Sequence, residues 1–212
     1  MSEIFAMIFE ALPDKNRKTF DDLGAFSDDF YLAGGTALAL QIGHRISVDF
    51  DLFSDKEIPA SLLQKINRLF DRKRVEVSVN NPEELTVFID EVKITFLQYP
   101  FPLVFEPVRL GNIRALSIKE IAATKAYTIG RRGSFKDYVD LFFIISEAHG
   151  SLEDIVALAE KKYGNEFNSR LFLEQLTYLD DVDDFAIIFL KRDIGKSDLQ
   201  SFFDNEVRKL AF

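Results

Sequence analysis

The stretch FYLAGGTALALQIGHRISVDFDLF, residues 30–53, decides the fold of this chain. It predicts a strand at 30–33, a glycine turn at 34–35, a short helix at 36–42 and a second strand that carries Asp49 and Asp51. Successive side chains of a strand point to opposite faces, so the two aspartates share one face and the other face takes Val48, Phe50 and Leu52. The sequence therefore predicts two carboxylates side by side.

Two carboxylates this close repel each other unless a cation or a hydrogen-bond network lies between them. Mg²⁺ binds one or two protein carboxylates together with substrate phosphates. The turn before the short helix offers backbone N–H groups that can receive those phosphates. We therefore interpret Asp49 and Asp51 as metal ligands, and Gly34, Gly35 and Thr36 as a seat for phosphates. Each feature alone has a plainer interpretation: the glycine pair as a turn that needs positive φ, and the two aspartates as a solvated acidic pair. Only their combination favours a site.

The segment GGTALAL at 34–40, followed by His44-Arg45, Ser47 and DFDLF at 49–53, resembles the AbiEii-type nucleotidyltransferase toxins. These belong to the DNA polymerase β-like nucleotidyltransferase superfamily, and the similarity extends over roughly residues 30–141. The resemblance implies an α+β fold, with a small mixed sheet flanked by helices and then a helical C-terminal module. It also adds Arg45 and Ser47 to the expected nucleotide-binding residues.

Composition sets limits on the other possibilities. The chain has 212 residues, 47% of them apolar, with 22 Phe, which is ample for a packed core. No apolar run is long enough to predict a membrane span. The absence of Cys excludes disulfides, thiolate metal sites and a Cys nucleophile, and fits a cytoplasmic protein. Two His and no Cys argue against a zinc site.

The charges are distributed unevenly along the chain. Residues 109–136 hold seven basic residues against one acid, a charge of +6, which leaves −15 for the rest because the whole chain carries −9. This asymmetry predicts a positive strip that meets an anionic ligand such as RNA. The alternative is a solvated face with salt bridges to the acidic C-terminal half.

One residue departs from the superfamily pattern. The resemblance implies a third carboxylate on a later strand, near Thr95, where this chain has threonine. A two-metal displacement needs ligands for both ions, so the departure leaves the third position open. Asp90, Asp137 or Asp140 could fill it.

The Pro- and Phe-rich stretch at 100–107 predicts a connection between two modules. We expect a nucleotidyltransferase core at 1–108 and a helical module at 109–212, packed closely on the core. Ser117 and Glu120 form a predicted capping box for a helix that runs to about Gly130.

Lys125 falls on the apolar stripe of this helix, where an ammonium needs a partner or a route to water. Lys125, the basic pair Arg131-Arg132 and the segment KDYVDL at 136–141 together resemble the family pattern. This resemblance favours phosphate binding by Lys125, Arg131 and Arg132. Asp137 and Asp140 share one side of the next predicted helix. Either they anchor one of these cations, or Asp140 activates the acceptor or binds metal.

These observations predict a Mg²⁺- or Mn²⁺-dependent enzyme that moves a nucleoside monophosphate from an NTP to a hydroxyl of RNA, such as tRNA, or of protein. Its catalytic residues would be Asp49, Asp51, Lys125 and Asp140. The resemblance implies the toxin of a type IV toxin–antitoxin pair, with an antitoxin as a partner. The alternative is a nucleotide- or partner-binding module that lost efficient transfer. Transfer to a small molecule such as an aminoglycoside would instead predict an acidic acceptor pocket.

Overall fold

The computed structural model describes residues 7–71, 73–183 and 186–210. The chain divides into two compact units. The first comprises Met1–Pro102 and Glu106–Leu116, and the second comprises Leu103–Phe105 and Ser117–Phe212.

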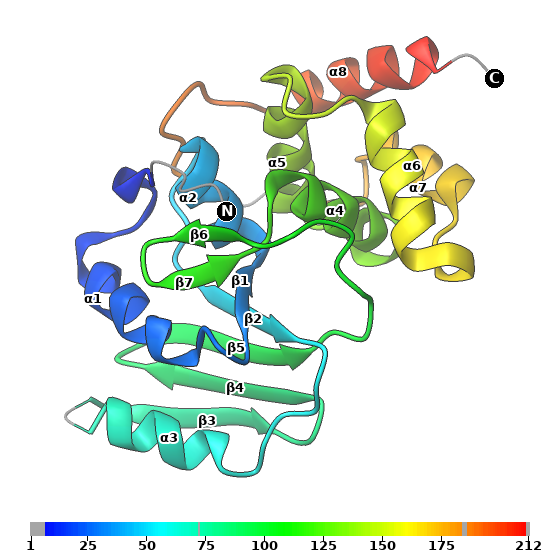
Figure 1. Ribbon diagram of the computed structural model, residues 1–212. Helices are drawn as coiled ribbons and strands as arrows, with labels where there is room; N and C mark the ends of the chain where they lie inside the picture. The colour runs from blue at the N-terminus through cyan, green and yellow to red at the C-terminus, as the bar shows by residue number, and fades with distance from the viewer. Residues whose placement is uncertain (1–6, 72, 184–185, 211–212) are drawn as a thin grey trace. The chain divides into compact units, whose positions relative to one another are not determined.

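The first unit is built on a seven-stranded mixed sheet with the order β3-β4-β5-β2-β1-β7-β6 (Figure 1). Strand β2 pairs with β1 in an antiparallel manner and with β5 in a parallel manner, so it lies at the centre. The strands are β1 (Tyr31–Ala33), β2 (Phe50–Ser54), β3 (Val75–Asn80), β4 (Glu84–Ile89), β5 (Val92–Gln98), β6 (Val108–Leu110) and β7 (Ile113–Ala115).

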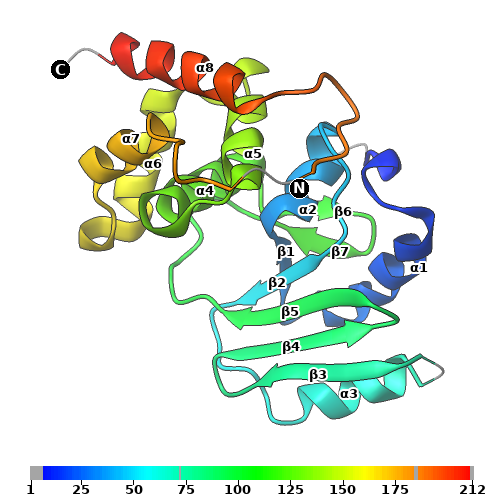
Figure 2. The same ribbon diagram turned by 180° about the vertical axis from the view of Figure 1, so that it is seen from behind.

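The α-helices that accompany this sheet are α1 (Asp14–Leu23), α2 (Gly34–Ile42) and α3 (Leu62–Leu69). Helix α2 follows β1 without a loop and is buried along most of its length, because its residues from Thr36 onward are small, apolar or internally bonded. Helix α3 is amphipathic, with Leu62 and Ile66 buried, and it lies beside the edge strand β3 in both Figure 1 and Figure 2.

Aromatic side chains form much of the core of the first unit. The ring of Phe96 on β5 lies 5.1 Å from the ring of Phe26 and 5.1 Å from that of Phe30, both in edge-to-face arrangements. Phe20 and Phe50 are also fully buried. Such contacts add to the burial of area and fix one face of β2 and β5 against the helices, which leaves the opposite face of these strands for the polar residues described below.

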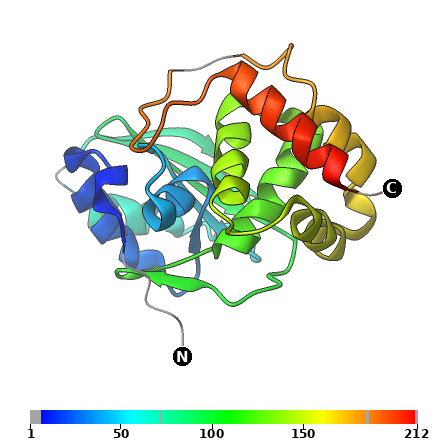
Figure 3. The ribbon, with the colours of Figure 1, turned by 90° about the horizontal axis from the view of Figure 1, so that it is seen from above.

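The second unit is helical. It consists of α4 (Ile118–Arg132), α5 (Phe135–Ser146), α6 (Leu152–Tyr163), α7 (Ser169–Leu176) and α8 (Lys196–Lys209). Serines cap several of these helices, as predicted for Ser117, whose side chain accepts a hydrogen bond from the Glu120 N–H. Figure 3 shows α8, in red, next to α5, where the rings of Phe142 and Phe202 lie 4.6 Å apart.

A buried ion pair fastens the segment Leu103–Phe105 to the second unit. Lys162 Nζ lies 2.5 Å from Glu120 Oε2, and both side chains are almost completely excluded from solvent. The other oxygen of Glu120 accepts hydrogen bonds from the backbone N–H groups of Val104 and Phe105. Each oxygen of this buried carboxylate therefore has a partner, which offsets part of the cost of desolvating it.

The α+β class, the mixed sheet and the helical second unit confirm the predicted fold class. Two local features differ from the prediction. Strand β2 begins at Phe50, so Val48 is 43% exposed instead of inward-facing. Residues 109–115, expected at the start of the helical module, instead belong with Val108 to the hairpin β6–β7, which pairs with β1 in the sheet of the first unit.

Candidate functional site

Helix α2 starts directly against the carboxylate of Asp51. Strands β1 and β2 pair Ala33 with Asp51, and the next residue, Gly34, begins α2 with φ +64. A Cβ atom built on Gly34 would lie only 2.5 Å from Asp51 Oδ2. Glycine is therefore required here twice, for its backbone conformation and for the space that the carboxylate fills. This brings together the predicted phosphate seat and one predicted metal ligand.

Side-chain hydrogen bonds, instead of backbone hydrogen bonds to a neighbouring strand, fix the loop before β2. Thr36 Oγ1 lies 2.7 Å from Ser47 Oγ and donates to the backbone oxygen of Asp49. Asn16 donates to the carbonyl of Val48 at 2.9 Å. These bonds explain why the strand begins only at Phe50, and they leave the Asp49 side chain exposed at its entrance. The two aspartates flank Phe50, but only Asp51 belongs to β2, so a shared face for the two carboxylates stays a prediction.

Three predicted nucleotide-binding residues of this region are buried. Thr36 and Ser47 bond each other, and Arg45, only 3% exposed, donates to the carbonyl of Ile46. These hydrogen bonds shape the loop that leads to Asp49. Contact of these three side chains with a nucleotide stays a prediction.

Thr95 stands beside Asp51, as the register of β2 and β5 shows. On the other side of β5 the next partner in this row is Thr86 of β4. Asp90 does not enter the row, because it lies in the β4–β5 turn, roughly 10 Å along the strand from Thr95, where it accepts a hydrogen bond from the Arg74 N–H. Thr86 was not predicted as a site residue, because the register between strands far apart in sequence leaves no local signal.

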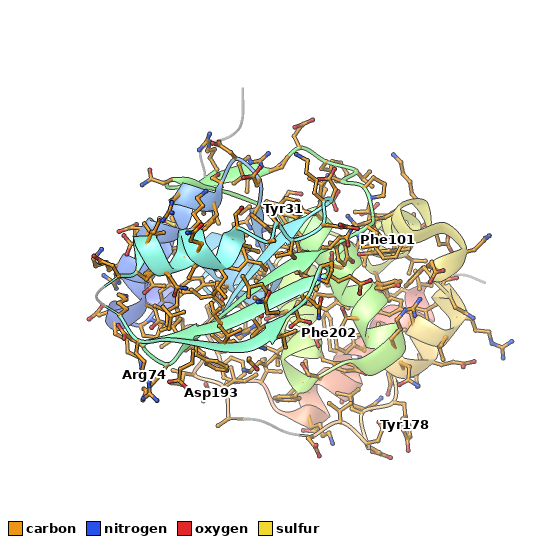
Figure 4. All side chains as sticks on the ribbon, turned by 90° about the horizontal axis from the view of Figure 1, so that it is seen from below. Tyr31, Arg74, Phe101, Tyr178, Asp193 and Phe202 are labelled. Carbon is orange, nitrogen blue, oxygen red and sulfur yellow. The ribbon has the colours of Figure 1, made fainter. Side chains whose placement is uncertain are left out.

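A row of aromatic rings follows on the face of the sheet that carries Asp51. Phe53, two residues after Asp51, stacks on Tyr99 with ring centroids 4.7 Å apart. Tyr31 and Phe101 extend this row at its two ends, and both are labelled in Figure 4. The carboxylate side of β2 thus continues into a largely apolar wall.

In the second unit, Lys125 is held between two aspartates. Its Nζ lies 2.7 Å from Asp137 Oδ1 and 2.7 Å from Asp140 Oδ2, and Asp140 is fully buried. Burial of Asp137 opposes its ionisation, but the Lys125 charge and the hydrogen bonds from Lys125 and Ser134 outweigh it and hold the pKa of Asp137 below its usual 3.8. The structure thus brings these three predicted residues together within one unit.

Two basic residues of 109–136 are engaged within their own units, and the positive strip as a whole stays a prediction. Arg114 donates to the carbonyls of Ser27 and Asp28 in the first unit. Arg131 pairs with Glu166 at 3.0 Å in the second, as the salt-bridge alternative predicted for this region. The side chain of Arg132 lies outside the described residues.

The second unit also contains a cavity of about 890 Å³ between its helices, with Phe105, Lys119, His149 and Phe202 in its walls. None of the predicted site residues is in the described lining of this cavity. Across the same described ranges, no helix has the length and apolar character needed to span a bilayer.

The carboxylates of Asp49 and Asp51 fit a metal ion that binds together with the phosphates of a nucleotide. Among the described residues, no three His, Cys, Asp or Glu side chains gather closely enough to hold an ion by themselves. Mg²⁺ in nucleotide-dependent enzymes commonly takes only one or two protein carboxylates, and phosphates and water complete its shell. Asp49 and Asp51, next to the N-terminus of α2, match that requirement.

Comparison with known proteins identifies the family of this chain. The family model described as "Nucleotidyl transferase AbiEii toxin, Type IV TA system" matches residues 20–209. An uncharacterized protein of Aquifex aeolicus (strain VF5) is 36% identical over 157 residues, which cover 73% of this chain and 75% of that protein.

Two solved structures share the fold at low identity. The nucleotidyltransferase toxin MenT4 of Mycobacterium tuberculosis H37Rv has a TM-score of 0.60 and 15% identity, over 90% of this chain and 80% of that one. JHP933 of Helicobacter pylori has a TM-score of 0.55 and 16% identity, over 94% of each chain. The fold is thus that of the polymerase β-like nucleotidyltransferases, and the chain belongs to the AbiEii family of nucleotidyltransferase toxins.

Proposed function

We propose that this transferase moves a nucleoside monophosphate from an NTP to a hydroxyl group of an RNA such as tRNA, or of a protein. The observation that carries the proposal is the contact between the N-terminus of α2 at Gly34 and the carboxylate of Asp51. It combines an anion-binding helix end with a cation-binding side chain, and a metal–triphosphate complex needs both.

In this proposal Asp49 and Asp51 hold Mg²⁺ or Mn²⁺, which would supply a Lewis acid for the phosphate oxygens. The backbone N–H groups at Gly34, Gly35 and Thr36 receive the β- and γ-phosphates. As the acceptor oxygen forms its bond to the α-phosphorus, the bond from that phosphorus to the bridging oxygen breaks and pyrophosphate leaves. The hydroxyl proton passes to solvent.

The other predicted site residues have a supporting part in this proposal. Lys125 would neutralise the charge that develops on the departing pyrophosphate. Asp137 and Asp140, each 2.7 Å from its ammonium, would keep that group charged and fixed in position. Arg131, Arg132, Arg45 and Ser47 would add contacts to the nucleotide. Membership of the type IV toxin family supports an antitoxin as a further partner.

Transfer of label from each of four α-labelled NTPs into total RNA or protein, in the presence of Mg²⁺, tests this function. We expect label with the wild-type protein and none with Asp49→Asn/Asp51→Asn. The exposed neighbour Asp55 offers the matched control, so Asp55→Asn should transfer label normally.

Thr95 beside Asp51 favours one alternative, a nucleotide-binding module that has lost efficient transfer. That alternative predicts NTP binding that depends on Asp49 and Asp51 but no transfer of label from any donor. Equal labelling by the wild type and the double variant would contradict both functions.

A further inference from the structure

Two hydroxyl groups and a carboxylate form a chain that leads away from the neighbour of Asp51. On β4, Thr86 Oγ1 lies 2.6 Å from Glu84 Oε1. The same Thr86 oxygen lies 3.3 Å from Thr95 Oγ1 on β5. Because Thr95 is the register partner of Asp51, this chain connects Glu84 to the position where the superfamily pattern would place a third carboxylate.

The direction of these hydrogen bonds follows from counting protons. A hydroxyl has one proton to donate, and a carboxylate can only accept. The short contact to Glu84 therefore takes the Thr86 proton, since bonds to charged acceptors are shorter and stronger. The Thr86 oxygen is left to accept, so the 3.3 Å contact is a bond that Thr95 donates to Thr86. With its own proton committed, Thr95 presents oxygen lone pairs as its remaining hydrogen-bonding capacity.

The position of the chain supports this reading. Glu84 and Thr86 are two residues apart on β4 and thus share a face, and the register pairs Thr86 with Thr95 and Thr95 with Asp51 on that face. Thr86 is 3% exposed and Thr95 is 9% exposed. Away from water, the charge of Glu84 polarises the two hydroxyl groups more strongly than it would at a surface.

We propose that Glu84, acting through Thr86, fixes the Thr95 hydroxyl as a hydrogen-bond acceptor for the attacking hydroxyl of the acceptor substrate. Thr95 Oγ1 thereby takes over the orienting task of the missing third carboxylate, and Glu84 and Thr86 are positioning residues. The proposal rests on the proposed nucleotidyl transfer. It changes no bond of that reaction, because Thr95 only orients the hydroxyl whose oxygen attacks the α-phosphorus.

A matched pair of substitutions at Thr86 tests the chain. Thr86→Val keeps the shape but removes the hydroxyl, whereas Thr86→Ser keeps the hydroxyl. We expect Thr86→Val to lower kcat about 10- to 100-fold, with an unchanged KM for the NTP, and Thr86→Ser to retain most of the activity. Glu84→Gln should fall between them, and the exposed neighbour Glu83 provides the control Glu83→Gln.

A bypass variant separates the orienting role from packing. Thr95→Asp supplies a carboxylate directly beside Asp51, so adding Thr86→Val should cost little further activity in that background. Equal kcat values for Thr86→Val and Thr86→Ser, or losses that multiply in the Thr95→Asp background, would overturn the inference. If those results appear while Asp49→Asn/Asp51→Asn still abolishes transfer, the proposed function stands and only the inference falls. Absence of transfer by the wild-type protein would overturn both.

Discussion

Gly34 lacks a side chain at the point where one would meet the Asp51 carboxylate. This single absence lets a helix N-terminus and an acidic group lie in contact, an arrangement in which the carboxylate also benefits from the helix dipole. The contact between Gly34 and Asp51 is thus the main constraint on the site, and adding a methyl group at Gly34 tests it.

Gly34→Ala should reduce stability and NTP binding together. The left-handed conformation costs alanine about 1–2 kcal/mol, and the new Cβ must also displace Asp51. Gly111 is the control, because its φ is +56 and a Cβ built there would make only an ordinary contact, 3.5 Å from Met7 Cε. We expect Gly111→Ala to show only the conformational cost in chemical denaturation. NTP binding that is equal in the two variants would contradict the role of the contact.

The charges around Lys125 predict an acid-dependent loss of stability. The pKa of Asp137 is lower in the folded protein than its usual 3.8, so the unfolded chain takes up the proton first as the pH falls. The stabilisation is complete above that usual value and is lost as the pH falls through the folded pKa.

Asp137→Asn should therefore flatten the decline in the free energy of unfolding below about pH 4. Urea denaturation at several pH values measures this slope, with Glu160→Gln at an exposed position of α6 as the control. An unchanged slope in Asp137→Asn would argue against the Lys125–Asp137 pair.

At the scale of elements, the entrance to β2 depends on side-chain hydrogen bonds from α2. Thr36 donates to the backbone of Asp49 and bonds Ser47, so it couples the helix that would seat phosphates to the loop that presents a metal ligand. Loss of the buried Thr36 hydroxyl would remove the hydrogen bonds to both Ser47 and the Asp49 backbone.

Thr36→Val should accordingly cost about 1–3 kcal/mol and weaken binding of Mn²⁺ in the presence of NTP. Thr128 supplies a control, since its hydroxyl donates to a carbonyl of its own helix. A Thr36→Val protein with wild-type stability and metal affinity would show that the loop does not need this bond.

The elements also show what sequence alone could reach. The order strand, glycine, helix, strand within residues 30–53 was predictable because its signals are local, and so was the Ser117 cap. The hairpin β6–β7 was missed because strands of three residues are too short to show a period. The pairing of Asp51, Thr95 and Thr86 joins segments far apart in sequence, and such a register depends on the whole sheet.

In the molecule as a whole, the short segment Leu103–Phe105 belongs to the helical unit, whereas the chain on both sides of it belongs to the first unit. The Glu120–Lys162 pair anchors Leu103–Phe105 to the helical unit. Glu120→Ala should destabilise that unit by about 3–5 kcal/mol, because it leaves a buried charge without its partner. Glu120→Leu/Lys162→Met should recover part of this loss in thermal unfolding. A double variant less stable than Glu120→Ala would contradict the explanation.

The most direct test of the central claim is the affinity for Mn²⁺ in the presence of a non-hydrolysable NTP, measured by electron paramagnetic resonance. The contact between Gly34 and Asp51 predicts that the wild-type protein binds the metal–nucleotide complex and that Asp51→Asn binds it at least about 10-fold more weakly. This measurement needs no knowledge of the acceptor. Equal affinities in the two proteins would contradict the assignment of this face of the sheet as the nucleotide site.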